Sequence, residues 1–311
     1  MKRAAVLALV LGCYNPTVAS DVPCNPAAPL CPSGQTCVQT GSTFACSGPT
    51  SVAFDAPVSR DVANPSGDDD HDGIPNSMDN CPEVYNPGQE NEDGDTWGDV
   101  CDLCPPYASA TQADADGDGV GDECDPHPNT AGDKMILFEG FHHGVPTGSG
   151  WTTVGVVTAA ADSVVATDAG SAFSGLGWQF APGNGETITT QVTILGEGTD
   201  PLVAVVDAAD VNADTGIAGE IGVDTGSGFQ DIYQLPDGPT LVTQAGSAGL
   251  DVPYKLVIER SAQKYQFSES WSGGNGTVTT DSTLMSPDPA LGITVIDASA
   301  KFDWLMVVQS N

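Results

Sequence analysis

Three groups of oxygen-bearing side chains share one spacing between Asp68 and Asp125. Each group occupies positions 1, 3, 5, 9 and 12 of a loop, and the members are Asp68, Asp70, Asp72, Asn76 and Asp79, then Asn91, Asp93, Asp95, Asp99 and Asp102, then Asp114, Asp116, Asp118, Asp122 and Asp125. Calcium takes about 6–8 oxygen ligands, and a 12-residue loop supplies them from these positions and from the backbone carbonyl at position 7. The carbonyls at position 7 belong to Ile74, Trp97 and Val120. The spacing therefore predicts calcium binding.

Of the candidate metal ions, calcium suits the acidic segment best, and calcium binding explains the segment better than disorder does. Magnesium prefers fewer protein ligands, and zinc prefers Cys and His. An acidic segment of low hydrophobicity is usually disordered. Acidic composition alone, however, does not place oxygen-bearing side chains at the same five positions of three successive loops. Between residues 61 and 133 there are 20 Asp or Glu and no Lys or Arg. We therefore expect about three or more calcium ions, and we expect calcium binding to drive folding of the segment.

The segment resembles an array of thrombospondin type 3 repeats. The matching stretches are Asp68–Pro82, Asn86–Asp102 and Ser109–Asp125, with departures from the family pattern at Asn91 and at Ser109-Ala110. Asn91 keeps an oxygen but lacks the charge, so the second site is expected to be weaker. The resemblance implies that neighbouring cysteines pair in order, Cys81 with Cys101 and Cys104 with Cys124, so that each disulfide ties one calcium loop to the next.

The N-terminus is expected to be a targeting segment. Residues 1–12 combine a basic start with a short apolar run, which is typical of a signal peptide and is far too short to span a bilayer as a helix. Val10-Leu11-Gly12-Cys13 resembles a bacterial lipobox, which implies lipidation of Cys13, a membrane anchor and an outer-membrane or cell-surface location. The alternative is an ordinary secretory signal that ends near Ala19-Ser20, and the protein would then be secreted.

Replacing the expected anchor residue tests this reading. We expect Cys13→Ser to move the protein from the membrane fraction to the soluble fraction, because the lipid can no longer be attached. Fractionation of cells that express each form measures the change. A variant that stays in the membrane would contradict lipidation at Cys13.

Eight further cysteines remain once Cys13 is set aside, and an even number suits an oxidising compartment. Residues 24–46 are predicted to form a small disulfide-rich module whose pairing the sequence leaves open, with a zinc site as the alternative; its cysteines are Cys24, Cys31, Cys37 and Cys46. Residues 47–67 are rich in Ser, Pro and Gly and are expected to be a linker. The repeats then occupy residues 68–133.

Residues 134–311 change to short apolar runs separated by Gly, Asp, Pro and Ser, with no sustained helical period. The strands expected are residues 135–140, 151–158, 177–180, 187–195, 202–206, 254–259, 264–269, 293–296 and 302–308. The predicted fold class is therefore mainly β: a calcium-loop array with little regular secondary structure, followed by an antiparallel β-sandwich (jelly roll).

This last part is similar to concanavalin A-like sandwiches, including the laminin G type. The similarity rests on Phe138–Phe141, Gly150-Trp151, the 254–260 strand with the next strand carrying Tyr265 and Phe267, and Ala300–Trp304. Relatives of this fold include lectins and glycosidases, so it implies a glycan-binding or protein-binding module with a glycosidase or lyase as the alternative. A third possibility is a structural spacer that binds only calcium.

The side chains favour binding over catalysis. The glucanase pattern of carboxylates at alternate strand positions is missing, and Glu220 and Asp224 are about 13 Å apart on an extended strand. We therefore expect no enzymatic activity. Trp271, beside a Gly-Gly turn, is the best candidate for stacking on a ligand, whereas Trp178 and Trp304 look like core residues. The net charge of −34 argues against nucleic acid as a partner.

Overall fold

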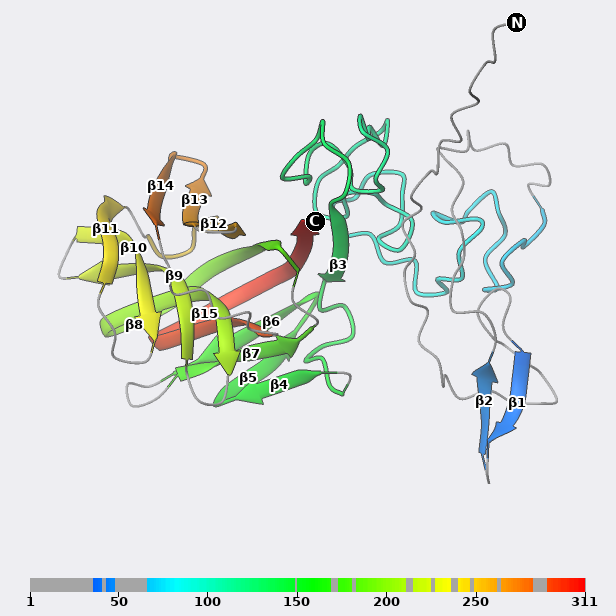
Figure 1. Ribbon diagram of the computed structural model, residues 1–311. Coiled ribbons are helices and arrows are strands. Elements are labelled where there is room, and N and C mark those ends of the chain that lie inside the picture. Colours follow the sequence, from blue (N-terminus) through cyan, green and yellow to red (C-terminus); the bar gives the residue numbers. More distant parts are fainter. Residues whose placement is uncertain are drawn as a thin grey trace, which may run out of the picture. The chain divides into compact units, whose positions relative to one another are not determined.

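A computed structural model describes residues 36–40, 43–47, 66–148, 150–168, 173–180, 183–210, 215–224, 227–235, 240–246, 249–261, 264–281 and 290–310 (Figure 1). The chain divides into two compact units, Met1–Lys134 and Met135–Asn311. Cys13, Cys24 and Cys31, the expected signal peptide and residues 48–65 of the expected linker lie outside the described residues. Within the described residues, no helix has the length and apolar character that crossing a bilayer requires.

The first unit contains one hairpin and a long run of turns. Strands β1 (Thr36–Thr40) and β2 (Thr43–Ser47) pair antiparallel, with Cys37 opposite Cys46. Residues 66–133 contain only turns, bends and irregular backbone. Because the segment has few apolar side chains, backbone bonds to carboxylates take the place of a regular ladder. Position 4 of each loop is left-handed, at His71, Gly94 and Gly117, which turns the chain back on itself.

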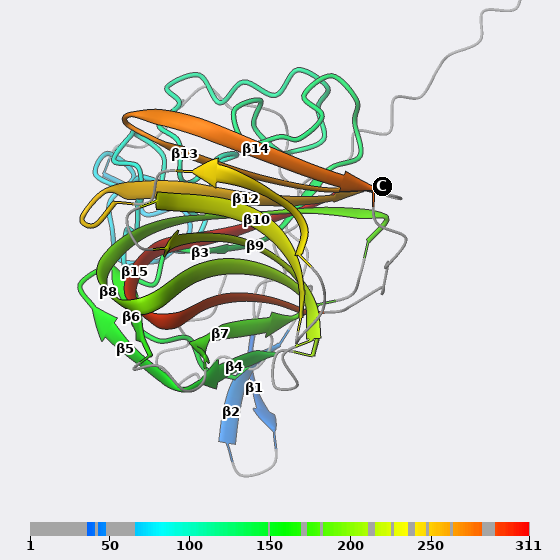
Figure 2. The ribbon, with the colours of Figure 1, turned by 90° about the vertical axis from the view of Figure 1, so that its left-hand side faces the viewer.

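The second unit is an antiparallel β-sandwich of thirteen described strands (Figures 1 and 2). Their bounds are β3 Lys134–Glu139, β4 Trp151–Val154, β5 Val156–Ala160, β6 Ser163–Thr167, β7 Phe173–Gln179, β8 Gly185–Asp210, β9 Thr215–Asp224, β10 Ser227–Leu235, β11 Thr240–Gly246, β12 Pro253–Ser261, β13 Lys264–Trp271, β14 Gly274–Asp281 and β15 Ala290–Ser310.

Two long strands, β8 and β15, run through both layers. Their first and second halves have different neighbours. One layer has the order β14-β13-β12-β8-β15-β6-β5 and uses the first half of β8 and the second half of β15. The other has the order β11-β10-β9-β8-β15-β7-β4 and uses the opposite halves. In Figure 2, β13 and β14 lie above β9 and β10.

The long strands bend at register shifts near Asp297. The register between β15 and β8 shifts between Ile296 and Ala298, and Asp297 has a positive φ of 45°. Asp168 stabilises this bend, because its Oδ2 accepts a hydrogen bond from the Asp297 amide at 3.0 Å and its own amide donates to the Ala298 carbonyl at 2.9 Å. Such bulges are a common way for a strand to change direction between sheets.

The predicted β-sandwich is confirmed, but several strand predictions are wrong in detail. The expected strands 187–195 and 202–206 are parts of one strand, β8, and 293–296 and 302–308 are parts of β15. The expected strand 151–158 is two strands, because Gly155 between them has a φ of 65° and a Cβ there would lie 2.2 Å from the Ser174 hydroxyl. Strands β6, β9, β10, β11 and β14 were not expected.

The core lies between the two layers and follows the alternation of the strands. In β12, Tyr254, Leu256, Ile258 and Arg260 are buried and their neighbours are more exposed. Trp304 is buried as expected. Trp178 packs against the core and stacks on Phe180, with ring centroids 5.4 Å apart. Alternate burial of this kind is the expected result of the two-residue period of a strand.

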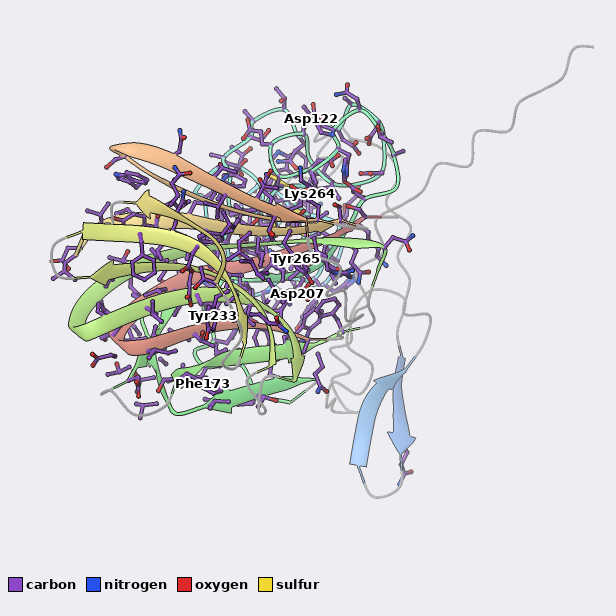
Figure 3. The ribbon with its side chains drawn as sticks, turned by 60° about the vertical axis from the view of Figure 1, so that its left-hand side comes forward. Asp122, Phe173, Asp207, Tyr233, Lys264 and Tyr265 are labelled. Carbon is purple, nitrogen blue, oxygen red and sulfur yellow. A yellow bond between two sulfur atoms is a disulfide. The ribbon has the colours of Figure 1, made fainter. Side chains whose placement is uncertain are left out.

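A polar network around Arg260 lies within this apolar core. Arg260 of β12 forms ion pairs with Glu186 and Asp207, which lie in opposite halves of β8, and its Nε is 3.2 Å from Asp207 Oδ2. The Tyr265 hydroxyl donates to the same Asp207 oxygen at 2.9 Å, and Figure 3 shows these two side chains next to each other. All four side chains are buried. The network therefore connects the two layers through charge as well as through apolar packing.

Candidate calcium sites

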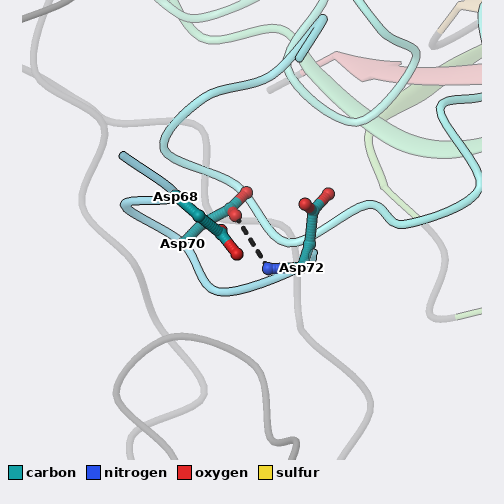
Figure 4. A group of neighbouring side chains, drawn as sticks. All are labelled: Asp68, Asp70 and Asp72. Atoms are coloured by element: carbon teal, nitrogen blue, oxygen red, sulfur yellow. Dashed lines mark hydrogen bonds between the residues drawn. The ribbon is translucent and has the colours of Figure 1, made fainter. Parts of the chain in front are cut away.

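The three acidic loops bring carboxylate oxygens together as the sequence predicts. The groups whose ligand atoms all lie within 4.8 Å of one another are Asp68, Asp70 and Asp72 (Figure 4), Asp93, Asp95 and Asp102, and Asp114, Asp116 and Asp118. In the first and third loops these are positions 1, 3 and 5. In the second loop, where Asn91 holds position 1, Asp102 at position 12 joins positions 3 and 5. The other predicted ligands remain predictions.

The same side-chain bonds to backbone amides shape each loop. The position 5 carboxylate accepts from the amide at position 7, with Asp72 to Ile74 at 2.7 Å, Asp95 to Trp97 at 2.6 Å and Asp118 to Val120 at 3.1 Å. The position 9 side chain accepts from the amide at position 2, with Asn76 to Asp69 at 3.0 Å, Asp99 to Glu92 at 2.8 Å and Asp122 to Ala115 at 2.8 Å. These bonds place the remaining oxygens toward one another.

The second loop differs at positions 1 and 6. In the first and third loops, Gly73 and Gly119 at position 6 have a positive φ and donate to the position 1 carboxylate at 3.1 and 2.9 Å. The second loop has Thr96 at position 6. Its position 4 amide, Gly94, donates to Asn91 Oδ1 at 2.8 Å, as Gly117 does to Asp114 Oδ1 at 2.7 Å in the third loop. Loss of one carboxylate and the change at position 6 agree with the expectation of a weaker second site.

Several carboxylate oxygens of the loops are buried without a hydrogen-bond partner. They are Oδ1 of Asp68, Oδ2 of Asp70, Asp79, Asp93, Asp102 and Asp125, and both oxygens of Asp116. Burying a carboxylate oxygen without a partner is costly, and a coordinated cation removes the cost. Hard oxygen ligands with this spacing suit Ca²⁺. The residues present therefore fit a calcium ion in each loop.

Burial disturbs the titration of these acids. It raises the pKa of Asp70 from 3.8 to about 6 and the pKa of Asp102 from 3.8 to about 7. Burial is also the largest cause that raises the pKa of Asp125 to about 7, with a hydrogen bond to Asp133 adding to it. The pKa values of Asp93 and Asp116 are raised for the same main reason. Without a cation, the folded loops therefore hold protons near neutral pH.

These shifts predict that calcium reverses the pH dependence of stability. Between about pH 4 and 7 the metal-free folded repeats bind more protons than the unfolded chain, so their stability falls as the pH rises. With calcium bound, protons compete for the same oxygens, so stability rises with pH. We expect the melting temperature of repeats freed of calcium by passage over a chelating resin to be higher at pH 5 than at pH 8, and the order to be opposite in millimolar calcium. Slopes of the same sign would contradict this.

Two disulfides and a repeated set of polar bonds link the loops. Cys81 is bonded to Cys101 and Cys104 to Cys124, as the resemblance implies. Successive loops start 23 residues apart, at Asp68, Asn91 and Asp114. The position 5 carboxylate also accepts from an amide 14 residues further on, and these amides belong to Asn86, Ser109 and Gly132 at 3.2, 2.9 and 2.9 Å.

Two glutamines in this linkage were not expected. Gln89 Nε2 donates to Asp79 Oδ1 at 2.8 Å, and Gln89 Oε1 accepts from the Asn80 amide at 2.9 Å. Gln112 hydrogen-bonds Asp102, and its Oε1 accepts from the Leu103 amide at 2.7 Å. Both glutamines have a positive φ. The 23-residue period from Gln89 to Gln112 is the signal that points to this role.

Trp271, the candidate ligand contact of the sandwich, ends β13 and is half-buried. Its ring packs against the core and lies 5.8 Å from the Tyr254 ring, centroid to centroid. A Cβ at Gly273 or Gly274 would lie 2.8 or 3.0 Å from the indole, so the turn itself packs on the ring. Only part of this indole is left for a ligand.

Glu220 has a different partner from the one considered in the sequence. It lies opposite Asp231 of β10, the two side chains are hydrogen-bonded, and both are buried. Burial raises the pKa of Asp231. Carboxyl groups in direct contact are closer than the about 5–5.5 Å of a retaining glycosidase.

The thrombospondin type 3 repeat family matches residues 66–89. No curated protein matches the sequence. Among solved structures, the CBM2 module of the evolved Dit of Lactobacillus casei BL23 phage J-1 is 12% identical with a TM-score of 0.44, over 58% of this chain and 97% of that chain. The carbohydrate-binding module CBM66 from Bacillus subtilis is 18% identical with a TM-score of 0.40, over 50% and 92%. SCLam, a non-specific endo-β-1,3(4)-glucanase of family GH16, is 10% identical with a TM-score of 0.41, over 58% and 93%.

Proposed function

We propose that this protein is a calcium-binding protein of the cell envelope or extracellular space, whose repeats fold around calcium and carry a β-sandwich that binds a glycan or a surface protein. The observation that carries the calcium part is the set of buried carboxylate oxygens without a hydrogen-bond partner in the three loops. The family match at residues 66–89 supports the same reading. The lipid anchor on Cys13 and the absence of enzymatic activity belong to this proposal.

Calorimetric titration of the metal-free protein with calcium tests the first part. We expect saturable binding of about three or more ions in the micromolar to millimolar range, as for sensor and extracellular calcium loops. Magnesium at the same concentrations serves as the control, because its small octahedral shell does not suit these loops. No heat of binding at millimolar calcium would refute the proposal.

The ligand of the sandwich needs its own experiment. The support is the partly exposed indole of Trp271 beside a turn, since aromatic faces stack on sugar rings. A glycan array probed with the full chain in calcium tests binding, and Trp271→Ala is expected to lose it while Trp178→Phe, a core substitution, keeps it. A reducing-sugar assay on the bound glycans tests turnover. Turnover abolished by substitution of a single carboxylate would favour the glycosidase alternative, and binding to no glycan would turn attention to protein partners.

A further inference from the structure

The third calcium loop ends differently from the first two. In the first two loops, a glutamine ten residues after position 12 donates an amide hydrogen to the position 12 carboxylate, Gln89 to Asp79 and Gln112 to Asp102. A neutral amide satisfies one oxygen and adds no charge to the site. The residue ten positions after Asp125 is a methionine, so this donor is missing from the third loop.

Asp133 takes the place of the glutamine. The chain after the third loop returns in the same way as after the others, because Asp118 Oδ2 accepts from the amides of Gly132 and Asp133 at 2.9 and 2.7 Å. This return buries the Asp133 side chain, which is 5% exposed, against Asp125, to which it is hydrogen-bonded. The Asp133 carboxylate also contacts His127 Nδ1 at 2.8 Å.

Two carboxylates in contact need a proton or a cation between them, because two negative charges at that distance repel strongly. In the same loop, Asp125 Oδ2 and both oxygens of Asp116 are buried without a hydrogen-bond partner. The arrangement therefore concentrates more negative charge around the third loop than a glutamine in that place would. Calcium affinity rises with the number of charged ligands in a loop.

From this geometry we infer that Asp133 is an additional carboxylate ligand of the third calcium site, and that the third loop binds calcium more tightly than the second, which has Asn91 at position 1. The inference rests on the proposed calcium binding of the repeats.

The test is a calcium titration of full-length Asp133→Gln followed by NMR, which reports each loop separately. The amides of Ile74, Trp97 and Val120 report the first, second and third loops. The variant installs the residue that the first two loops use, so the hydrogen bond to Asp125 is retained and the charge is removed. We expect calcium affinity at Val120 to fall about tenfold and affinities at Ile74 and Trp97 to stay unchanged.

Glu123→Gln is the matched control, because it removes one charge from the same loop at an exposed side chain. It is expected to leave the affinity at Val120 within about twofold of the native value. Asp133→Asn, which keeps the side-chain length, should give the same loss as Asp133→Gln and guards against a folding defect in one variant. Unchanged affinity at Val120 in both variants overturns the inference while calcium binding by the repeats stands. Absence of calcium shifts in all three loops of the native protein overturns the proposed function as well.

Discussion

Removing calcium is expected to destabilise residues 66–133 strongly and to leave the sandwich folded. The repeats have few buried apolar side chains, and most of their buried side chains are polar, among them the acids Asp70, Asp79 and Asp102. If each of three loops has a Kd one-tenth of a millimolar calcium supply, bound calcium stabilises the repeats by about 4 kcal/mol by mass action. That is a large fraction of the stability of a typical small domain.

Scanning calorimetry and small-angle scattering measure this effect. In calcium, we expect a transition for each unit. In EGTA, the transition of the repeats should move down or vanish, the radius of gyration should rise, and the transition of the sandwich should stay where it was. Restoring calcium should reverse the change, whereas adding magnesium should not. An unchanged radius and an unchanged transition in EGTA would show that the disulfides Cys81–Cys101 and Cys104–Cys124 suffice to hold the repeats.

Replacing Arg260 with Ala is expected to destabilise the sandwich by about 3–5 kcal/mol. The substitution leaves the buried carboxylates Glu186 and Asp207 without their cation, and breaking a buried pair costs this much because an uncompensated charge remains in the interior. Urea denaturation followed by tryptophan fluorescence measures the free energy of unfolding.

Two comparisons separate charge from packing in this network. Lys301→Ala removes the more exposed ion pair with Asp303, whose Nζ–Oδ1 distance is 2.7 Å, and should cost at most about 1 kcal/mol. Combining Arg260→Met with Glu186→Gln and Asp207→Asn removes all the charges together and should recover most of the lost stability. If the triple variant is as unstable as Arg260→Ala, lost packing rather than unpaired charge is the cause.

For the repeats, local sequence contained nearly all the information about the site. The ligand spacing in each loop is a short-range property. The side chain at position 5 accepts a hydrogen bond from the amide at position 7, and the side chain at position 9 accepts one from the amide at position 2. The pairing of Cys81 with Cys101 was implied by the family resemblance. Gln89, Gln112 and Asp133 were missed because their partners lie eight to ten residues away, outside a 12-residue loop pattern.

For the sandwich, sequence predicted the class and parts of the long strands β8 and β15, but it missed the strands β9 and β6 that pair with them. Strands β9, β10 and β11 combine glycines with buried polar residues such as Glu220, Gln230 and Asp231, so the alternation of apolar and polar side chains is weak. The break at Gly155 depends on Ser174, a residue nineteen positions away, which no local pattern reports.

The sequence by itself predicted calcium loops in the acidic segment and a β-sandwich after it, because both predictions rest on spacings of two to twelve residues. Only the tertiary structure decided that β8 and β15 pass through both layers, that Arg260 joins Glu186 to Asp207, and that Asp133 meets Asp125. These contacts depend on how the chain returns on itself. These contacts are stabilised by apolar burial and by the pairing of buried charges, and both involve residues that are far apart in the sequence.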